Sequence, residues 1–266
     1  MSLSRAAIVA ALLGSAAARV VSQEPGPRYS SAALACAVFE ESVRTKLRGE
    51  SGSAAVEDRA GRDGVVAMTA RDTTGGLAIE LWFDSLAVWR QTGQGRETPD
   101  TEGVIGGRYR GLLEGAGRYH SRKVPFVPDE LADVSDLAGF VVEFFPRLPA
   151  VALRVGQSWS DTGGLAIRRL GDLRGRSTPI QRYQWTWNRR QADVTTVTDS
   201  LSVTVDQVIR ETGEMAWSGQ LGPLSWNRRL EITARIPPKG GVRQSVTSNL
   251  SQDINVARRL PVEGCH

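Results

Sequence analysis

Residues 183–188 read Tyr-Gln-Trp-Thr-Trp-Asn, and this stretch decides the fold. Its aromatic residues, Tyr183, Trp185 and Trp187, alternate with polar ones, so they share one face of an extended chain. A period of two is typical of a half-buried β-strand, because a helix would spread the same rings around its circumference. The stretch therefore predicts a strand with one aromatic face.

The same alternation extends over much of the chain on both sides of this stretch. Downstream it recurs over 201–209, 230–236 and 242–256, and upstream Leu81 and Phe83 alternate with polar or small residues after the Gly-containing turn 72–76. A single strand over 242–256 would be roughly 50 Å long at ~3.3 Å per residue. Strands of this length favour a curved sheet over a compact sandwich. We therefore predict a mainly β fold, with long antiparallel strands in a curved sheet or half-open barrel.

One segment has helical spacing instead. Leu131, Val134, Val141 and Phe144 recur at intervals that place them on one helix face, Asp129 is a candidate N-cap, and a proline follows at 146. We expect one α-helix over about 129–145 that covers the sheet and separates two β-meanders.

The N-terminus has the layout of a secretory signal. A short segment with one positive charge, 1–5, precedes the uncharged apolar run 6–18, and small residues follow. We predict a signal peptide over 1–22, a flexible lead-in over 23–36, a single β-rich domain over 37–260 and a tail over 261–266. No later segment approaches the ~18 uninterrupted apolar residues of a membrane helix. The expected location is therefore periplasmic or secreted, in soluble form.

The two cysteines, Cys36 and Cys265, lie near opposite ends of the mature chain. In an oxidising compartment a bridge between them would tie the termini together. The alternative is two unpaired thiols.

Charge and composition exclude several classes of function. All but three of the 33 basic residues are Arg, and they are scattered among 29 acidic ones without a basic tract, so nucleic-acid binding has no electrostatic support. No cluster of Cys, His or carboxylates has the spacing of a metal site, and no Gly-rich phosphate loop is present, so we expect no metal and no cofactor. The only candidates for hydrolytic chemistry are His120 and a carboxylate pair brought together by the fold.

The aromatic residues are the stronger indication of function. They either fill a core or line a cavity in a curved sheet too wide for its own side chains to fill. On the second interpretation the ligand-binding side chains come from two strands and the helix: Leu81, Phe83, Tyr183, Trp185, Trp187, Val141 and Phe144.

Two short motifs carry a resemblance to known proteins. The segment 145–159 contains Leu148-Pro149 and then Val-Gly156-x-x-Trp159, and Gly107-x-Tyr-x-Gly-Leu-Leu113 precedes the predicted helix. Through these motifs, residues 75–160 resemble a family of exported bacterial proteins of unknown function. The glycine of the second motif allows a tight turn, and its Trp anchors the next strand. The strand rhythm is also similar to the half-open barrels of bacterial lipoprotein carriers and mycobacterial lipid-binding lipoproteins.

The resulting hypothesis is a non-enzymatic exported protein that binds an apolar ligand, such as a lipid or acyl chain, or a protein partner in its concave face. Three alternatives remain open at this point: a structural or interaction domain with a filled core, an outer-membrane β-barrel, and a hydrolase.

Overall fold

The structure is a computed structural model that describes residues 24–51, 54–175, 179–198, 201–238 and 245–259. The predicted signal peptide and the tail 261–266 lie outside these ranges. The described part is mainly β, as predicted, with three short helices, α1 (Ser31–Leu34), α2 (Asp129–Ala132) and α3 (Phe140–Phe144).

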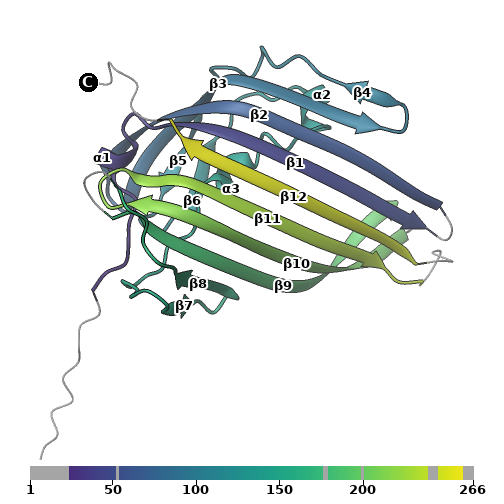
Figure 1. Cartoon of the computed structure of the whole chain (residues 1–266). Coiled ribbons are helices and arrows are strands. Elements are labelled where there is room, and N and C mark those ends of the chain that lie inside the picture. The colour runs from purple at the N-terminus through teal and green to yellow at the C-terminus, as the bar shows by residue number, and fades with distance from the viewer. Residues whose placement is uncertain (1–23, 52–53, 176–178, 199–200, 239–244, 260–266) are drawn as a thin grey trace, which may run out of the picture.

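The strands form one antiparallel sheet in the order β6-β5-β3-β2-β1-β12-β11-β10-β9-β8-β7, with β4 paired to β3 (Figure 1). Their bounds are β1 (Val38–Ser51), β2 (Ala54–Thr73), β3 (Gly76–Thr92), β4 (Gly95–Glu97), β5 (Tyr109–Leu113), β6 (Tyr119–Lys123), β7 (Ser158–Ser160), β8 (Leu165–Arg169), β9 (Gln181–Thr198), β10 (Leu201–Ser218), β11 (Gly222–Ile236) and β12 (Val246–Arg258). Each half of the chain is a meander, and β1 pairs with β12 over its whole length, which joins the two halves.

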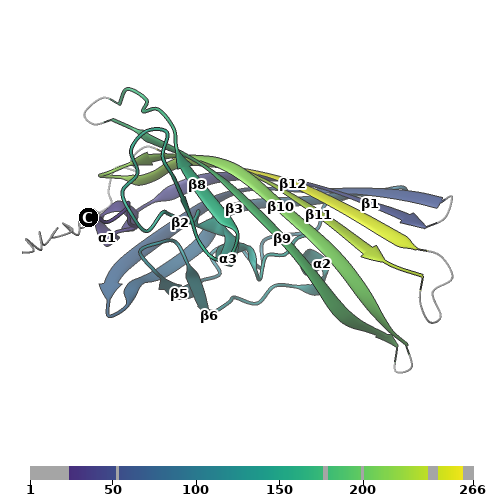
Figure 2. The ribbon, with the colours of Figure 1, turned by 90° about the horizontal axis from the view of Figure 1, so that it is seen from below.

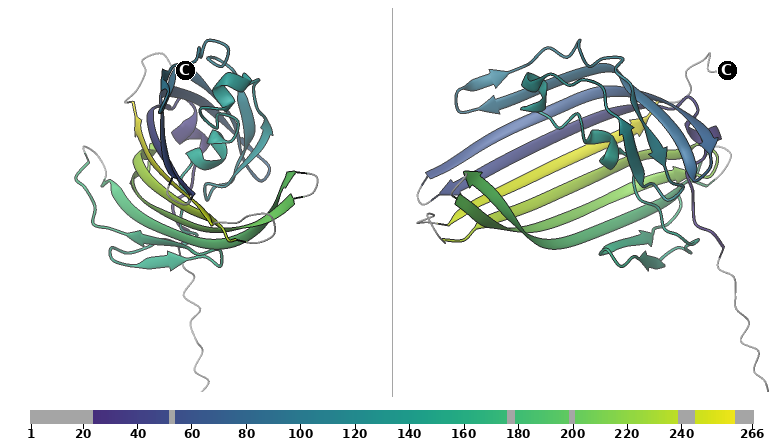
Figure 3. Two further views of the ribbon diagram at one scale, coloured as in Figure 1. Left: turned by 90° about the vertical axis from the view of Figure 1, so that its right-hand side faces the viewer. Right: turned by 180° about the vertical axis from the view of Figure 1, so that it is seen from behind.

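The sheet is strongly curved but not closed, so the prediction of a curved sheet is confirmed. Seen along the strands, it wraps around α3 and the loops beside it as a half-barrel (Figure 3). We call the face of β1 that carries Phe39, Glu41 and Val43 the inner face, and the face that carries Glu40 and Ser42 the outer face. Because side chains alternate along a strand, every neighbouring strand contributes to both faces.

The predicted helix over 129–145 is interrupted in the structure. α2 ends at Ala132, and α3 begins only at Phe140. Between them, the Oδ1 atom of Asp136 accepts a hydrogen bond from the backbone N–H of Gly139 at 2.7 Å. Short polar side chains compete in this way with helical backbone hydrogen bonds, and glycine adds a further helix penalty. The apolar spacing therefore predicted the covered face correctly but not the break.

The segment 24–36, expected as a flexible lead-in, is packed along the body of the protein. Pro25 forms a β-bridge with Val151, and Ser30 caps α1 by accepting a hydrogen bond from the Ala33 N–H. The hydroxyl of Tyr29, a residue only 4% exposed, donates to the Pro146 carbonyl at 2.9 Å. Burial of this one aromatic ring is enough to fix the segment.

The core lies at one end of the long strands, beneath α3. Along the inner face of β1, the exposed fraction of the residues rises from 0% at Phe39 and 4% at Val43 to 39% at Leu47. The strands continue well past α3, as Figure 2 shows. The inner face of this extension keeps the alternating apolar pattern, although the described residues place no helix over it. The extension forms an apolar trough that continues the core.

A candidate ligand cavity on the inner face

A cavity of about 910 Å³ lies between α3 and the inner face of β1, β2 and β9–β12. It begins among the buried side chains of the core and runs into the trough. From Trp226 to Ile232 on β11, its wall covers six residue steps, or about 20 Å of strand. The cavity therefore extends about 20 Å along the strands and crosses the neighbouring strands from β2 to β9.

Three tryptophans form the aromatic part of the sheet wall, and each contacts a neighbouring group of the protein. The Nε1 atom of Trp185 donates to Glu211 Oε1 at 2.8 Å, and that of Trp187 donates to the Gly163 carbonyl at 2.8 Å. Trp226 packs edge-on against Phe144, with ring centroids 5.1 Å apart. Because the two hydrogen-bonded indole N–H groups are satisfied within the protein, their rings are free to offer apolar surface to the cavity.

A glycine makes room for one of these rings. Gly213 of β10 pairs with Trp185, and a Cβ atom built on Gly213 would lie 2.2 Å from Cζ2 of that ring and 2.5 Å from a backbone oxygen. No side chain fits there without moving the indole. The absence of a side chain at Gly213 therefore allows the Trp185 ring to take its position in the cavity wall.

Aliphatic side chains form a further part of the sheet wall, beside polar ones such as Thr45 and Gln252. They come from alternate positions on three neighbouring strands: Val43, Leu230, Ile232, Leu250, Ile254 and Val256. Leu230, Ile232 and Leu250 are half-buried, whereas Val43, Ile254 and Val256 are buried under α3. The open end of the cavity is thus only partly covered, and its aliphatic side chains lie beside the hydrogen-bonded pair of Thr45 and Gln252.

A buried ion pair fixes the covering segment to the sheet. Arg62 on β2 donates to both carboxylate oxygens of Glu41 on β1, at 2.8 and 2.9 Å, and the two side chains are only 7% and 3% exposed. The same guanidinium donates to Ser135 Oγ at 3.1 Å and lies 5.2 Å from the centre of the Phe140 ring. Since Ser135 and Phe140 belong to the α2–α3 segment, the pair ties that segment to the sheet.

A second arginine holds α3 from the other half of the sheet. Arg228 on β11 donates to Glu143 Oε2 at 2.6 Å and lies 3.9 Å from Glu211. Its Nε atom is buried and has no hydrogen-bond partner among the described residues. Arg62 and Arg228 together clamp the covering segment between the two halves of the sheet.

Three of the seven predicted ligand-binding residues line the cavity: Phe144, Trp185 and Trp187. The other four, Leu81, Phe83, Tyr183 and Val141, are buried in the surrounding core and do not line it. Trp226 and the aliphatic wall were missed at the sequence level. Their alternation is visible in the sequence, but only the paired strands show which face is concave.

The residues of the Leu-Pro and Val-Gly-x-x-Trp motifs lie outside the cavity. Leu148 is buried and its N–H donates to the Ala116 carbonyl. Gly156 has φ of +84°, a conformation that favours glycine, and its N–H donates to the Arg169 carbonyl at 2.8 Å. Trp159 is partly buried against the core, and Pro149 lies beside Gly26 of the N-terminal segment.

His120, the candidate for hydrolytic chemistry, lies at the surface. His120 is on the exposed side of β6, where its Nε2 atom lies 2.6 Å from Glu114 Oε1. No group of three or more metal-ligating side chains occurs among the described residues. Within the same residues, no helix has the length and apolar character needed to span a membrane. Cys36 lies in the described part, but Cys265 does not, so their pairing stays a prediction.

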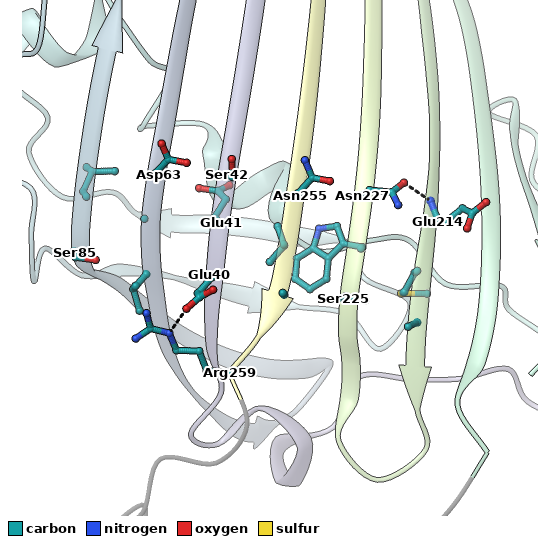
Figure 4. A pocket seen from close by; sticks show the side chains of 18 of the residues that line it. Glu40, Glu41, Ser42, Asp63, Ser85, Glu214, Ser225, Asn227, Asn255 and Arg259 are labelled. Atoms are coloured by element: carbon teal, nitrogen blue, oxygen red, sulfur yellow. Dashed lines mark hydrogen bonds and ion pairs between the residues drawn. The ribbon is translucent and has the colours of Figure 1, made fainter. Parts of the chain in front are cut away.

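A second hollow, of about 1020 Å³, lies on the outer face of β1, β2 and β10–β12. Ser42, Asp63, Asn227 and Asn255 present polar groups along it (Figure 4). Its charged side chains are already paired: Glu40 with Arg259, Asp63 with Arg44, and Glu214 with Arg182. These three ion pairs leave the charged groups of the outer hollow with partners inside the protein.

No family model matches the sequence, and no curated protein matches it. Among solved structures, the chain is similar to one described as "lipid-protein interactions in lipovitellin". The sequence identity is 13%, the TM-score is 0.42, and the match covers 85% of this chain. This chain spans only about a quarter of the lipovitellin chain, since 26% of that chain is covered.

Proposed function

We propose that this protein is a non-enzymatic, exported binding protein that holds the hydrocarbon chain of a lipid-like ligand in the cavity on its inner face. The observation that carries the proposal is the continuation of the core into a half-exposed apolar trough. A filled structural core would bury these side chains, whereas here Leu230, Ile232 and Leu250 line open space.

The size and shape of the cavity support a chain-like ligand. Small-molecule sites typically enclose ~300–1,000 Å³, and this cavity of about 910 Å³ lies near the upper end. One leaflet of a bilayer is about 15 Å deep, half of the ~30 Å hydrocarbon core, and an acyl chain spans that depth. The roughly 20 Å of strand along the cavity is long enough for such a chain. Each methylene transferred from water would contribute about 0.8 kcal/mol.

The first test asks whether ligand is present in the purified protein. Native mass spectrometry before and after organic extraction would show a mass difference corresponding to a bound lipid. Extracted protein is then titrated with dodecanol below its solubility limit, and Trp185, Trp187 and Trp226 report binding through their fluorescence. A protein that is empty as isolated and that also fails to take up the alcohol would refute the proposal and favour a structural or protein-binding role.

A matched pair of variants locates the site. Ile232→Asn places an amide in the cavity wall, whereas Thr233→Asn makes a polar replacement at the next residue, whose exposed side chain points to the outer face. Burial of an unpaired amide costs ~1–3 kcal/mol, so Ile232→Asn should weaken binding by about tenfold. Thr233→Asn should bind like the wild type. Equal affinity in both variants would place the ligand elsewhere.

A further inference from the structure

Five arginines line the inner cavity, and only two of them have an ion-pair partner among the described residues. Arg62 and Arg228 form the ion pairs that clamp the α2–α3 segment. The other three have no carboxylate within ion-pair distance and no side-chain hydrogen bond in the ranges that the structure describes: Arg118, Arg147 and Arg189. Three positive charges at the cavity are thus uncompensated by any direct partner.

The carboxylates of the cavity wall are, in contrast, all engaged. Glu41, Glu143 and Glu211 accept from the arginine and tryptophan donors described above. Asp136 accepts from the Gly139 N–H, and Asp161 accepts from the N–H groups of Gly163 and Leu165. The donors of the wall that have no direct partner in the protein are therefore cationic, and they can bind an anionic acceptor from outside.

Arg118 and Arg147 lie together, although they are distant in sequence. Arg118 directly precedes β6, and Arg147 follows α3; the backbone bond from Leu148 N–H to the Ala116 carbonyl joins their two segments. Burial lowers the pKa of Arg147, and the positive charge of Arg118 lowers it further, while Asp161 and Glu114 offset part of this effect. Arg147 is partly buried, whereas Arg118 is exposed. Arg189 is also exposed and lies beyond Trp187 on β9.

We propose that Arg118 and Arg147 bind the anionic headgroup of an amphipathic ligand whose hydrocarbon chain occupies the apolar cavity. This inference rests on the proposed function and adds the ligand class, an acyl chain with a carboxylate or a phosphate. Guanidinium groups hold both anions through paired, charge-assisted hydrogen bonds. The two arginines and the aliphatic wall belong to the same cavity, so one molecule can contact both.

The partly buried Arg147 is the residue of this pair that costs the folded state stability. Two cations held close together, one of them half-buried, disfavour the folded state because each disfavours the charged form of the other. An ion pair would have removed this cost, as it does for Arg62. A ligand anion would supply the missing partner of Arg147, which is partly buried, and Arg118 beside it is exposed and open to the same anion.

The test uses one double variant and one control with the same change in net charge. Arg118→Gln/Arg147→Gln removes the proposed site. Arg154→Gln/Arg168→Gln removes two exposed arginines that do not line the cavity. Each extracted full-length protein is titrated with dodecanoate, dodecyl phosphate and dodecanol, with tryptophan fluorescence and calorimetry as readouts, at two salt concentrations.

The wild type should bind at least one of the two anions about tenfold to a hundredfold more tightly than the alcohol, as expected for charge-assisted hydrogen bonds. The site variant should lose this preference while its affinity for dodecanol is unchanged, and the control should keep it. The comparison of dodecanoate with dodecyl phosphate identifies the anion. The site variant should also be at least as resistant to urea as the wild type, because a repulsion has been removed.

Three results would overturn the inference, and only the last of them would also overturn the proposed function. Binding of all three probes with equal affinity, or an anion preference that survives in the site variant, refutes the headgroup site while the proposed function stands. Failure of every probe to bind the wild type refutes both.

Discussion

Breaking the buried ion pair between Glu41 and Arg62 should be far more costly than breaking an exposed one. In Glu41→Gln the guanidinium of Arg62, only 7% exposed, would lose its carboxylate and remain as an uncompensated buried charge. Removal of one partner from such a pair typically costs 3–5 kcal/mol, so we expect the free energy of unfolding to fall by about 4 kcal/mol. Urea denaturation followed by circular dichroism measures this change.

A control is available on the opposite face of the same two strands. Arg44 and Asp63 form an ion pair at 2.9 Å with both side chains about half exposed, and Asp63→Asn should cost less than about 1 kcal/mol because solvent screens the pair. The double variant Glu41→Leu/Arg62→Met removes both buried charges and should lie within about 2 kcal/mol of the wild type. A loss below about 1 kcal/mol for Glu41→Gln, or a double variant as unstable as the sum of the two single ones, would refute this reasoning.

Three further predictions concern the rest of the fold. Gly213→Ala should lower the free energy of unfolding by about 1–3 kcal/mol through overpacking and shift the tryptophan fluorescence, whereas Gly49→Ala, which has nothing within 4 Å of the new Cβ, should leave both unchanged in the same urea titration. Burial raises the pKa of all four tyrosines, that of Tyr119 to about 12, so ultraviolet titration should show no phenolate near pH 10 in the folded protein. Because the folded state holds these protons more tightly than the unfolded chain, stability should be full below pH 10 and fall as the pH rises towards 12; a normal titration near pH 10 in folded protein would contradict this. A bridge between Cys36 and Cys265 predicts a shift in gel mobility on reduction, and two titratable thiols before reduction would dismiss it.

The geometry of the chain ends is compatible with that bridge. Arg259, the last described residue, donates its backbone N–H to the Val38 carbonyl at 2.9 Å, and Val38 is two residues from Cys36. The six residues from 260 to 265 can span up to roughly 20 Å. The distance is therefore no obstacle, and the gel experiment decides the pairing.

The cavity was only partly predictable from the sequence. Trp185 and Trp187 were selected because their alternation with polar residues is strong, and Phe144 because helical spacing placed it on the covered face. All three line the cavity, and their binding of a ligand stays a prediction. Leu81 and Phe83 have the same alternation but lie where β3 packs under the covering segment, so they are buried. Whether a residue of the inner face is buried in the core or lines the cavity depends on how far along the strand it lies. Alternation with a period of two predicts only the face, not this position.

The charged residues of the cavity were harder to foresee. Glu41 and Arg62 are 21 residues apart, and nothing local distinguishes them from the exposed pair of Arg44 and Asp63. Their importance follows from the β1–β2 register, which places them diagonally on the inner face. The same is true of Arg118 and Arg147, which meet only because the β5–β6 turn packs against the segment after α3.

The sequence by itself determined the class of fold, since alternation of apolar and polar side chains over long stretches is compatible only with extended strands that have one buried face. It also determined that the segment 129–145 would cover that face. Tertiary structure alone decided where the covering stops, which arginines find a partner, and hence which part of the inner face remains open to a ligand. The reason is physical: periodicity is a property of neighbouring residues, whereas burial and ion pairing depend on strand register and on contacts between residues far apart in the chain.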